Sequence, residues 1–190
     1  MNIEELKREL KEYLSNDEKR YQHSIGVMEM SEKLAINYGC DIERCKKAAL
    51  MHDMAKTMPN KKKLEYVEDN KLKVTKTELM VPGILHGKIA ADICKKKYIF
   101  DKEMCDAIEN HTTGRANMSL MEKIIYVADA VEINRDYSDV KYYRDLAFND
   151  LDRAVLEIVD FVIEDNIKKG NIILEKSIES RNFILINRKK

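Results

Sequence analysis

Apolar residues recur at helical spacing along nearly the whole chain, and no segment shows the sustained alternation of apolar and polar residues that predicts a strand. Only two prolines and six glycines punctuate the 190 residues, so the helical pattern is rarely interrupted. The sequence therefore predicts an all-α protein. It shows no internal repeat, low-complexity tract or shift in composition that would divide the chain into two independent domains.

Capping residues and apolar spacing together set the expected helix boundaries. Ser15 and Glu18 form a capping-box pattern, and Ser119 and Glu122 form a second one. The lysine-rich stretch over residues 59–82 is expected to be a polar connector. The expected helices cover residues 3–14, 15–39, 41–52, about 86–93, 101–111, 119–131 and 150–169, followed by a last segment at 172–186.

Charge and cysteine usage exclude several classes of function. Lysine plus arginine equal aspartate plus glutamate at 34 each, so no overall charge would recruit nucleic acid or an anionic membrane. No apolar stretch approaches the roughly 20 residues needed to span a bilayer. The four cysteines show no CxxC spacing, and no secretory signal opens the chain. We therefore expect a soluble, cytoplasmic protein that binds neither nucleic acid nor membrane.

The four histidines and Asp129 fall at positions that the apolar spacing predicts to be buried, and Asp53 can turn toward the same point as His52 where their helix ends. Any one of them is most simply a core residue with its own hydrogen-bond partner. As a set they would need several separate partners, whereas convergence on metal would satisfy all of them together. We therefore favour a metal site between helices, with these candidate ligands: His23, His52, Asp53, His86, His111 and Asp129.

The order of these residues, with His52 and Asp53 adjacent, resembles that of the HD-domain phosphohydrolase superfamily. The surrounding segments narrow the resemblance to the YqeK family of bacterial HD-domain hydrolases, over about residues 20–186. One departure is Asn134, where relatives are expected to carry proline. The segments that carry the resemblance are RYQHSIGV (20–27), LMHDMAK (50–56), ILHGKIAA (84–91), HTTGR (111–115) and YVADAVEINRDY (126–137).

The resemblance implies one HD domain over residues 1–190, a helical bundle with the metal site between its helices. The core that bears the motifs would span about residues 16–137, and C-terminal helices would follow over about residues 139–186. It also implies symmetrical cleavage of diadenosine tetraphosphate, and of related dinucleoside tetraphosphates, into nucleoside diphosphates such as ADP. A homodimer is left open.

Hydrolysis of a phosphoanhydride needs a hydroxide at neutral pH and neutralisation of phosphate oxygens. Bound metal can supply both, since it lowers the pKa of water to about 7. Six ligands suit a binuclear centre in which Asp53 bridges two ions, whereas with a single ion the last two histidines would contact phosphate. The remaining ligands would divide between the ions as follows: His23, His52 and Asp129 at the first, His86 and His111 at the second. The residues expected to act in catalysis are Asp53, His86, His111 and Asp129.

Imidazole and carboxylate ligands suit iron, manganese, zinc or cobalt, and the choice of iron rests on the resemblance. Several polar side chains close to the ligands in sequence are expected to bind the substrate, although a solvated helix face or helix capping would also explain them. Glu132, one turn after Asp129, would either orient a ligand or form a surface ion pair. The expected substrate-binding residues are Arg20, Lys56, Thr112, Arg115 and Arg135.

Two other functions stay open. The same metal site with a different pocket would make a nucleotidase or a nucleoside triphosphatase. A protein that kept the fold without turnover would be a nucleotide-binding or ribosome-associated regulator. The presence of all six candidate ligands argues for the enzyme.

Overall fold

The computed structural model describes residues 1–187, and every regular element in that part of the chain is a helix. The prediction of an all-α fold is therefore confirmed. The elements in chain order are α1 (Ile3–Tyr13), α2 (Glu18–Tyr38), α3 (Ile42–Met51), α4 (Asn60–Asp69), α5 (Lys76–Met80), the 3-10 helix η1 (Pro82–Ile84), α6 (Leu85–Tyr98), α7 (Lys102–Asn110), α8 (Leu120–Val131), α9 (Val140–Asn149), α10 (Leu151–Lys168) and α11 (Glu175–Asn187).

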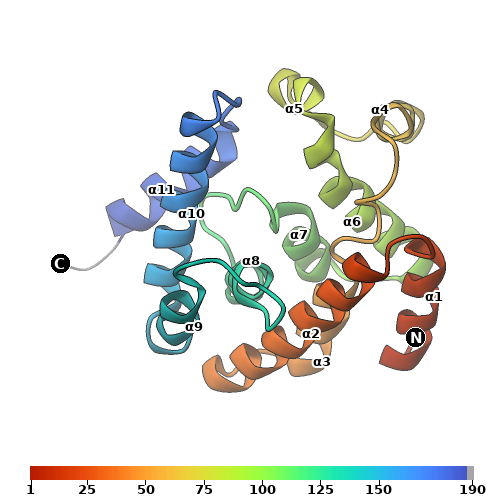
Figure 1. Cartoon of the computed structure of the whole chain (residues 1–190). Helices are drawn as coiled ribbons and strands as arrows, with labels where there is room; N and C mark the ends of the chain where they lie inside the picture. Colours follow the sequence, from red (N-terminus) through yellow and green to blue (C-terminus); the bar gives the residue numbers. More distant parts are fainter. Residues whose placement is uncertain (188–190) are drawn as a thin grey trace.

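Helix α8 lies at the centre of the bundle. It packs against α2, α7 and α10, and Figure 1 shows it between α10 on one side and the α2–α7 side of the molecule on the other. Ile124, Ile125 and Val127 of this helix have no exposed surface. Because α8 also carries Asp129, its central position brings that carboxylate among the helices that carry the histidines.

Side-chain caps explain where several of these helices begin. Asp17, Asp41 and Asp101 each accept a hydrogen bond from the backbone N–H three residues later, at the start of α2, α3 and α7. The capping box that we expected at Ser119 and Glu122 is present at the start of α8. These caps satisfy N–H groups that have no partner inside the helix.

The capping box expected at Ser15 and Glu18 is wrong. Leu14 is the C-cap of α1, and the Ser15 N–H donates back to Glu12 O at 3.3 Å. Ser15 therefore belongs to the turn that closes α1, and its side chain does not cap the next helix. The cap of α2 is Asp17, whose N–H donates to Leu14 O at 2.8 Å.

The expected polar connector over residues 59–82 is also wrong, because this stretch contains α4, α5 and η1. Helix α4 packs against α6, buries Val67 and places Leu64 against the core. Helix α5 begins with a capping box between Thr75 and Glu78. The lysine-rich run is thus a packed part of the fold.

Helices α6 and α7 approach each other closely at Gly87. A Cβ atom on this glycine would lie 2.8 Å from Glu109 O and 3.1 Å from Ile108 O, which no larger residue could tolerate without a shift of the backbone. His86 and His111 flank the contact, and their ring centroids are 4.9 Å apart. The glycine therefore permits the approach that brings these two rings together.

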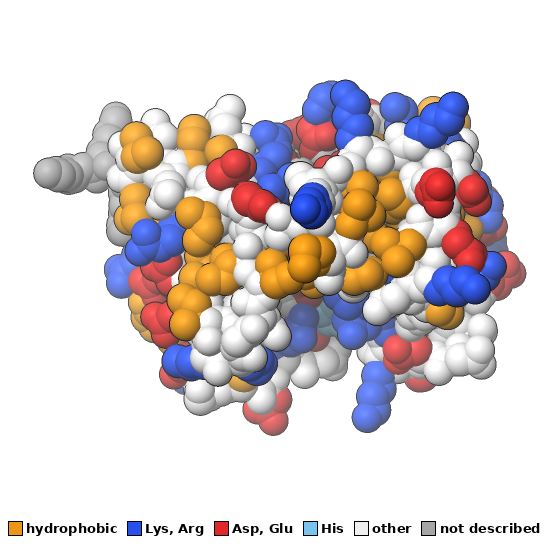
Figure 2. Space-filling model, turned by 90° about the horizontal axis from the view of Figure 1, so that it is seen from above, with side chains coloured by type: hydrophobic (Ala, Val, Ile, Leu, Met, Phe, Trp, Pro, Cys, Tyr) orange, Lys and Arg blue, Asp and Glu red, His pale blue; other side chains and the backbone are white. Residues whose placement is uncertain are grey.

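The surface formed by α5 and by the segment after α10 carries exposed apolar side chains. These two parts lie at the top of Figure 1, and they include the exposed residues Leu79, Met80 and Ile172. Figure 2, which views the molecule from above, shows apolar side chains grouped across that face with charged side chains around them. Within the described residues, no helix has both the length and the apolar character that crossing a bilayer requires.

Candidate metal centre

His52 and Asp53 lie at the point where α3 ends. The helix stops at Met51, His52 is its C-cap, and turns follow over residues 52–57. Both side chains are buried, and His52 Nε2 lies 3.6 Å from Asp53 Oδ2. Adjacent residues in a continuing helix would point about 100° apart. The helix end therefore accounts for two neighbouring polar side chains that meet in the interior.

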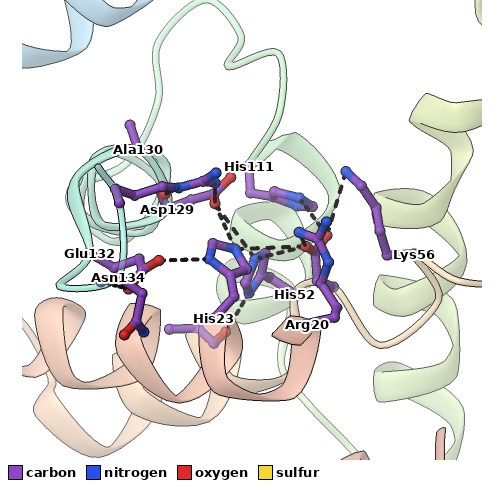
Figure 3. A network of polar contacts seen from close by, with 12 residues as sticks. Arg20, His23, His52, Lys56, His111, Asp129, Ala130, Glu132 and Asn134 are labelled. Atoms are coloured by element: carbon purple, nitrogen blue, oxygen red, sulfur yellow. Dashed lines mark hydrogen bonds and ion pairs between the residues drawn. The ribbon is translucent and has the colours of Figure 1, made fainter. Parts of the chain in front are cut away.

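Five of the six predicted ligands fall into two adjacent groups at the centre of the bundle, and Figure 3 labels four of these five residues. In each group, the nitrogen and oxygen atoms that could hold a metal lie within 4.8 Å of one another. The two groups share one histidine, so they form a single cluster. Their members are His23, His52 and Asp129 in the first and His52, Asp53 and His111 in the second.

Asp53 joins the two groups because its two carboxylate oxygens face different histidines. Oδ2 lies 3.6 Å from His52 Nε2 and 3.8 Å from His23 Nε2. Oδ1 lies 3.0 Å from His86 Nε2 and 3.5 Å from His111 Nε2. This arrangement suits a carboxylate that bridges two ions.

Hydrogen bonds at Nδ1 fix the orientation of all four imidazole rings. Nδ1 of His52, His86 and His111 each donates to the carbonyl oxygen three residues earlier, at 2.6, 2.7 and 2.7 Å respectively. Nδ1 of His23 donates to Glu132 Oε1 at 3.1 Å. Carbonyl and carboxylate oxygens only accept, so a proton is assigned to Nδ1 of each ring, and the neutral form of such a ring presents a lone pair at Nε2. This is the tautomer that a metal-binding histidine needs.

Three inward-facing atoms of the centre lack a hydrogen-bond partner among the described residues, and two others face each other as acceptors. Burial lowers the pKa of His52 to about 3 and that of His86 to about 4, so both rings are neutral at pH 7. Nε2 of His86 and Nε2 of His111 lie 3.0 Å apart, which sets two lone pairs against each other in these tautomers. Within residues 1–187, His23 Nε2, His52 Nε2 and Asp53 Oδ1 are buried without a hydrogen-bond partner. Bound cations would satisfy all of these atoms, so the residues fit a divalent metal centre.

Three cationic side chains lie at this centre, and Figure 3 labels two of them, Arg20 and Lys56. Arg20 Nη1 lies 2.7 Å from Asp53 Oδ2, and Arg135 Nη2 lies 2.8 Å from Asp129 Oδ1. Lys56 Nζ lies 3.8 Å from Asp53 Oδ1. All three side chains are partly exposed, so they stand between the buried ligands and solvent.

Arg115 lies away from the centre, contrary to the expectation that it contacts substrate. Its guanidinium forms two hydrogen bonds of 2.6 Å with the carboxylate of Glu122, a buried residue. It lines a small cavity with Met118 and Phe183 that includes none of the predicted ligands. Thr112, in contrast, lines a cavity directly beside His111.

Glu132 is buried under His23 and forms no surface ion pair. It is 1% exposed, its Oε1 accepts from His23 Nδ1, and its Oε2 accepts from the Asn134 N–H at 2.6 Å. Gly26 leaves the space for this carboxylate, because a Cβ atom there would overlap Oε2. Of the two roles considered for Glu132, the structure therefore supports the orientation of a ligand.

Arg144 on α9 holds the segment that follows α8, and the sequence analysis did not identify it. Its guanidinium donates to Val131 O at 2.8 Å, Glu132 O at 2.6 Å and Arg135 O at 2.9 Å. All three acceptors are backbone carbonyls, which leave no side-chain pattern in the sequence. Arg144 thus fixes the backbone on which Glu132 and Arg135 stand.

Two cavities open beside the ligands. We call the first, of about 410 Å³, the aromatic cavity, and the second, of about 610 Å³, the polar groove. The aromatic cavity is lined by His111, Thr112, Tyr126, Asp129, Ala130, Arg135, Tyr137, Tyr143, Ile158, Phe161, Val162, Asp165 and Lys169. The polar groove is lined by Asp17, Glu18, Lys19, Arg20, Gln22, His23, Glu132, Asn134 and Arg135.

Comparison with known proteins identifies the family of the chain. Residues 20–134 match the family model described as HD domain. This range contains all six predicted ligands.

Three relatives match nearly end to end, and each is named bis(5'-nucleosyl)-tetraphosphatase, symmetrical. The Staphylococcus aureus protein is 37% identical over 96% of this chain and 94% of its own length. The Halalkalibacterium halodurans protein is 35% identical over 90% of this chain and 92% of its own length. The Bacillus subtilis protein is 31% identical over 97% of this chain and 98% of its own length.

A solved structure has the same fold. The crystal structure of a predicted HD superfamily hydrolase involved in NAD metabolism, from Clostridium acetobutylicum, superposes with a TM-score of 0.91. It is 38% identical in sequence, and the match covers 95% of this chain and 97% of that one.

Proposed function

The chain belongs to the HD-domain family and, within it, to the symmetrical bis(5'-nucleosyl)-tetraphosphatases, and we propose that it hydrolyses diadenosine tetraphosphate to two ADP. The reaction consumes one water and breaks the P–O bond between the second and third phosphates. Related dinucleoside tetraphosphates would be cleaved at the same bond.

The observation that carries this proposal is the convergence of four Nδ1-protonated imidazoles on two carboxylates in a buried site. A structural core would give each histidine its own acceptor and donor. Here the Nε2 atoms face one another and carboxylate oxygens, and those of His23 and His52 have no hydrogen-bond partner among the described residues. Cations bound between the ligands would satisfy these atoms, which supports a metal centre.

The HD domain depends on divalent metal ions, which lower the pKa of a water molecule to about 7 and neutralise phosphate oxygens. We propose that this site binds two iron ions, with Asp53 bridging them. Its ligand set is imidazole and carboxylate without thiolate, which suits iron and also manganese, zinc or cobalt. The residues to which we assign metal binding are His23, His52, Asp53, His86, His111 and Asp129, and those to which we assign catalysis are Asp53, His86, His111 and Asp129.

The formal charges of the cationic and anionic side chains around the centre sum to zero before metal binds. Bound cations would therefore give the site a positive charge that attracts the polyphosphate. A guanidinium group can donate two parallel hydrogen bonds to phosphate oxygens, so Arg20 and Arg135 are suited to orient the chain of phosphates. Lys56 is suited to neutralise the leaving diphosphate. The balancing groups are Arg20, Lys56 and Arg135 against Asp53, Asp129 and Glu132.

We also propose that the 190 residues form one domain. The C-terminal helix α10 packs directly on α8, and α11 packs on α10, so both are continuous with the helices that carry the ligands. Removal of residues after 150 should therefore destabilise the metal centre.

Product analysis tests the proposed activity. Protein loaded anaerobically with iron, manganese, zinc or cobalt is incubated with diadenosine tetraphosphate, and the nucleotides are separated by chromatography. ADP alone is expected, with the fastest turnover for the iron form. AMP plus ATP, or free phosphate, would reject symmetrical cleavage, and absence of turnover by the fully loaded protein would instead support a nucleotide-binding regulator.

Substitution at the bridge tests the site assignment. Asp53→Asn keeps the shape of the side chain and removes its charge, so it should lower bound metal and turnover by at least about 1000-fold, as removal of a central catalytic group does. Asp69→Asn, at an exposed position on α4, is the matched control and should change neither. Retention of metal and turnover by Asp53→Asn would reject the assignment.

A further inference from the structure

The aromatic cavity and the polar groove have opposite chemistry, although both adjoin the ligands. Four tyrosine and phenylalanine rings line the cavity. Two of them, Tyr137 and Phe161, are nearly parallel, with an interplanar angle of 17° and centroids 5.9 Å apart. Tyr143 adds a third ring, 6.2 Å from Tyr137. Aromatic rings of this kind are the surfaces on which nucleobases stack.

The same cavity is also lined by a tyrosine whose hydroxyl has no hydrogen-bond partner among the described residues. Tyr126 is 4% exposed and lines the cavity, and its hydroxyl makes no hydrogen bond within residues 1–187. Burial raises the pKa of this hydroxyl, so it keeps its proton and can donate. Because the hydroxyl has no partner in the protein, a polar ligand bound in the cavity would offer it an acceptor. The cavity thus combines stacking surfaces with one directed donor.

The polar groove offers nothing comparable. Every residue that lines it is charged or polar, and its single ring is the candidate ligand His23. Arg20 and Arg135 provide guanidinium groups, whereas the acidic side chains already accept from protein donors: Asp17 caps α2, and Glu132 accepts from His23. The groove therefore suits phosphate oxygens and gives a nucleobase no surface to stack on.

Arg135 lines both spaces and pairs with Asp129 between them. A polyphosphate that crosses the ligands would therefore have one end in the cavity and the other in the groove. The two halves of a symmetrical dinucleotide would meet different surroundings.

We propose that the aromatic cavity holds one nucleoside of the substrate, and that the polar groove binds only the distal phosphates, so the second nucleoside is dispensable for cleavage. The inference rests on the proposed function and adds the way in which the substrate is recognised. It extends the substrate class to mononucleoside tetraphosphates. Adenosine 5'-tetraphosphate plus one water would give ADP and pyrophosphate, because the same bond between the second and third phosphates is broken.

A comparison of substrates tests this inference. Metal-loaded protein is given diadenosine tetraphosphate, adenosine 5'-tetraphosphate or inorganic tetraphosphate, and kcat/KM and products are measured for each. The mononucleotide should be cleaved to ADP and pyrophosphate with a kcat/KM within about tenfold of the dinucleotide, since it keeps the stacked base. Inorganic tetraphosphate should be cleaved at least about tenfold less efficiently, because it lacks that base.

The results separate the two proposals. If diadenosine tetraphosphate is not cleaved to ADP, the proposed function fails. If it is cleaved to ADP while adenosine 5'-tetraphosphate is inert, or yields ATP and phosphate, only the present inference is overturned.

Substitution in the cavity gives a second measurement. Phe161 is 48% exposed, so Phe161→Ala should leave the fold intact. It should raise KM about tenfold for both nucleotides, with kcat nearly unchanged, through loss of one stacking partner. Phe148→Ala, at a 37% exposed phenylalanine outside the cavity, is the matched control and should alter neither constant.

Binding of ADP, followed by calorimetry, provides a readout without turnover. Phe161→Ala should weaken ADP binding by about the same factor as it raises KM, and should leave the binding of pyrophosphate unchanged. Equal effects of Phe161→Ala on ADP and on pyrophosphate, or an unchanged affinity for ADP, would overturn the assignment of the cavity.

Discussion

The Glu132 carboxylate lies over Gly26, in the space that a Cβ atom at that position would occupy. The same carboxylate accepts the hydrogen bond from His23 Nδ1, and His23 lies one turn before Gly26 on α2. Glycine inside a helix is less favourable than alanine by about 1 kcal/mol. Gly26 therefore lowers the stability of α2 locally, at the position where the Glu132 carboxylate has to approach His23 and orient its ring.

Gly26→Ala should displace Glu132 and release the His23 ring. Loss of an outer hydrogen bond to a metal-binding histidine typically reduces metal affinity about 10- to 100-fold, and we expect a reduction of that size. Calorimetric titration of the metal-free protein measures it. Gly83→Ala, where no atom lies within 4 Å of the added Cβ, should have no effect on affinity.

Glu132→Ala should act through the same contact without crowding α2. The buried His23 Nδ1 would lose its acceptor, so metal affinity should again fall by about 10- to 100-fold while the helical circular dichroism is retained. Glu132→Gln keeps an acceptor oxygen and should restore part of the affinity. Glu29→Ala, at an exposed position on the same helix as His23, is the control. Equal affinities for all three variants would show that Glu132 does not position the ligand.

Removal of metal should lower the melting temperature. Binding stabilises the folded state by about 2.7 kcal/mol when free metal is 100 times the dissociation constant. For a chain of this size that corresponds to a shift of roughly 5–10 °C, measured by calorimetry before and after treatment with a chelator. Asp53→Asn, which we expect not to bind metal, should show no shift with the chelator.

Arg115→Met should reduce stability and leave turnover nearly intact. The substitution removes two hydrogen bonds from Glu122, which is 2% exposed, and a buried carboxylate without its partner costs about 1–3 kcal/mol. Urea unfolding measures this loss. Arg153→Met breaks an exposed pair with Glu157 and should cost at most about 1 kcal/mol. A large rise in KM for Arg115→Met would instead restore the expectation that this residue contacts substrate.

The sequence predicted the all-α fold and the residues that meet at the centre, because both leave clear patterns. Apolar spacing placed the histidines on inward faces, and the adjacent pair His52–Asp53 marked the end of a helix. Two features of the site depend on exact backbone placement and were not predicted: the hydrogen bonds of Arg144 and the aromatic stacking in the cavity. Arg144 acts on carbonyl oxygens, and the stacking of Tyr137 and Phe161 depends on the packing of α10 against the segment after α8.

The errors at helix boundaries have a local physical cause. Ser15 has the right spacing to Glu18 for a capping box, but the chain still uses that residue to close α1. In the lysine-rich stretch, the capping box between Thr75 and Glu78 could have predicted the start of α5, but the high charge of the stretch led us to expect a connector. There, half-buried Leu64 and buried Val67 supply the packing that holds a short helix.

The six candidate ligands come from segments spread between position 23 and position 129. During synthesis on the ribosome, a nascent chain cannot assemble this centre until α8 has emerged and docked. Metal uptake should therefore be a late event that reports on completed folding. Once loaded, the ions would tie together α2, α6, α8 and the ends of α3 and α7, so that unfolding of any one of them requires release of the metal and becomes slow.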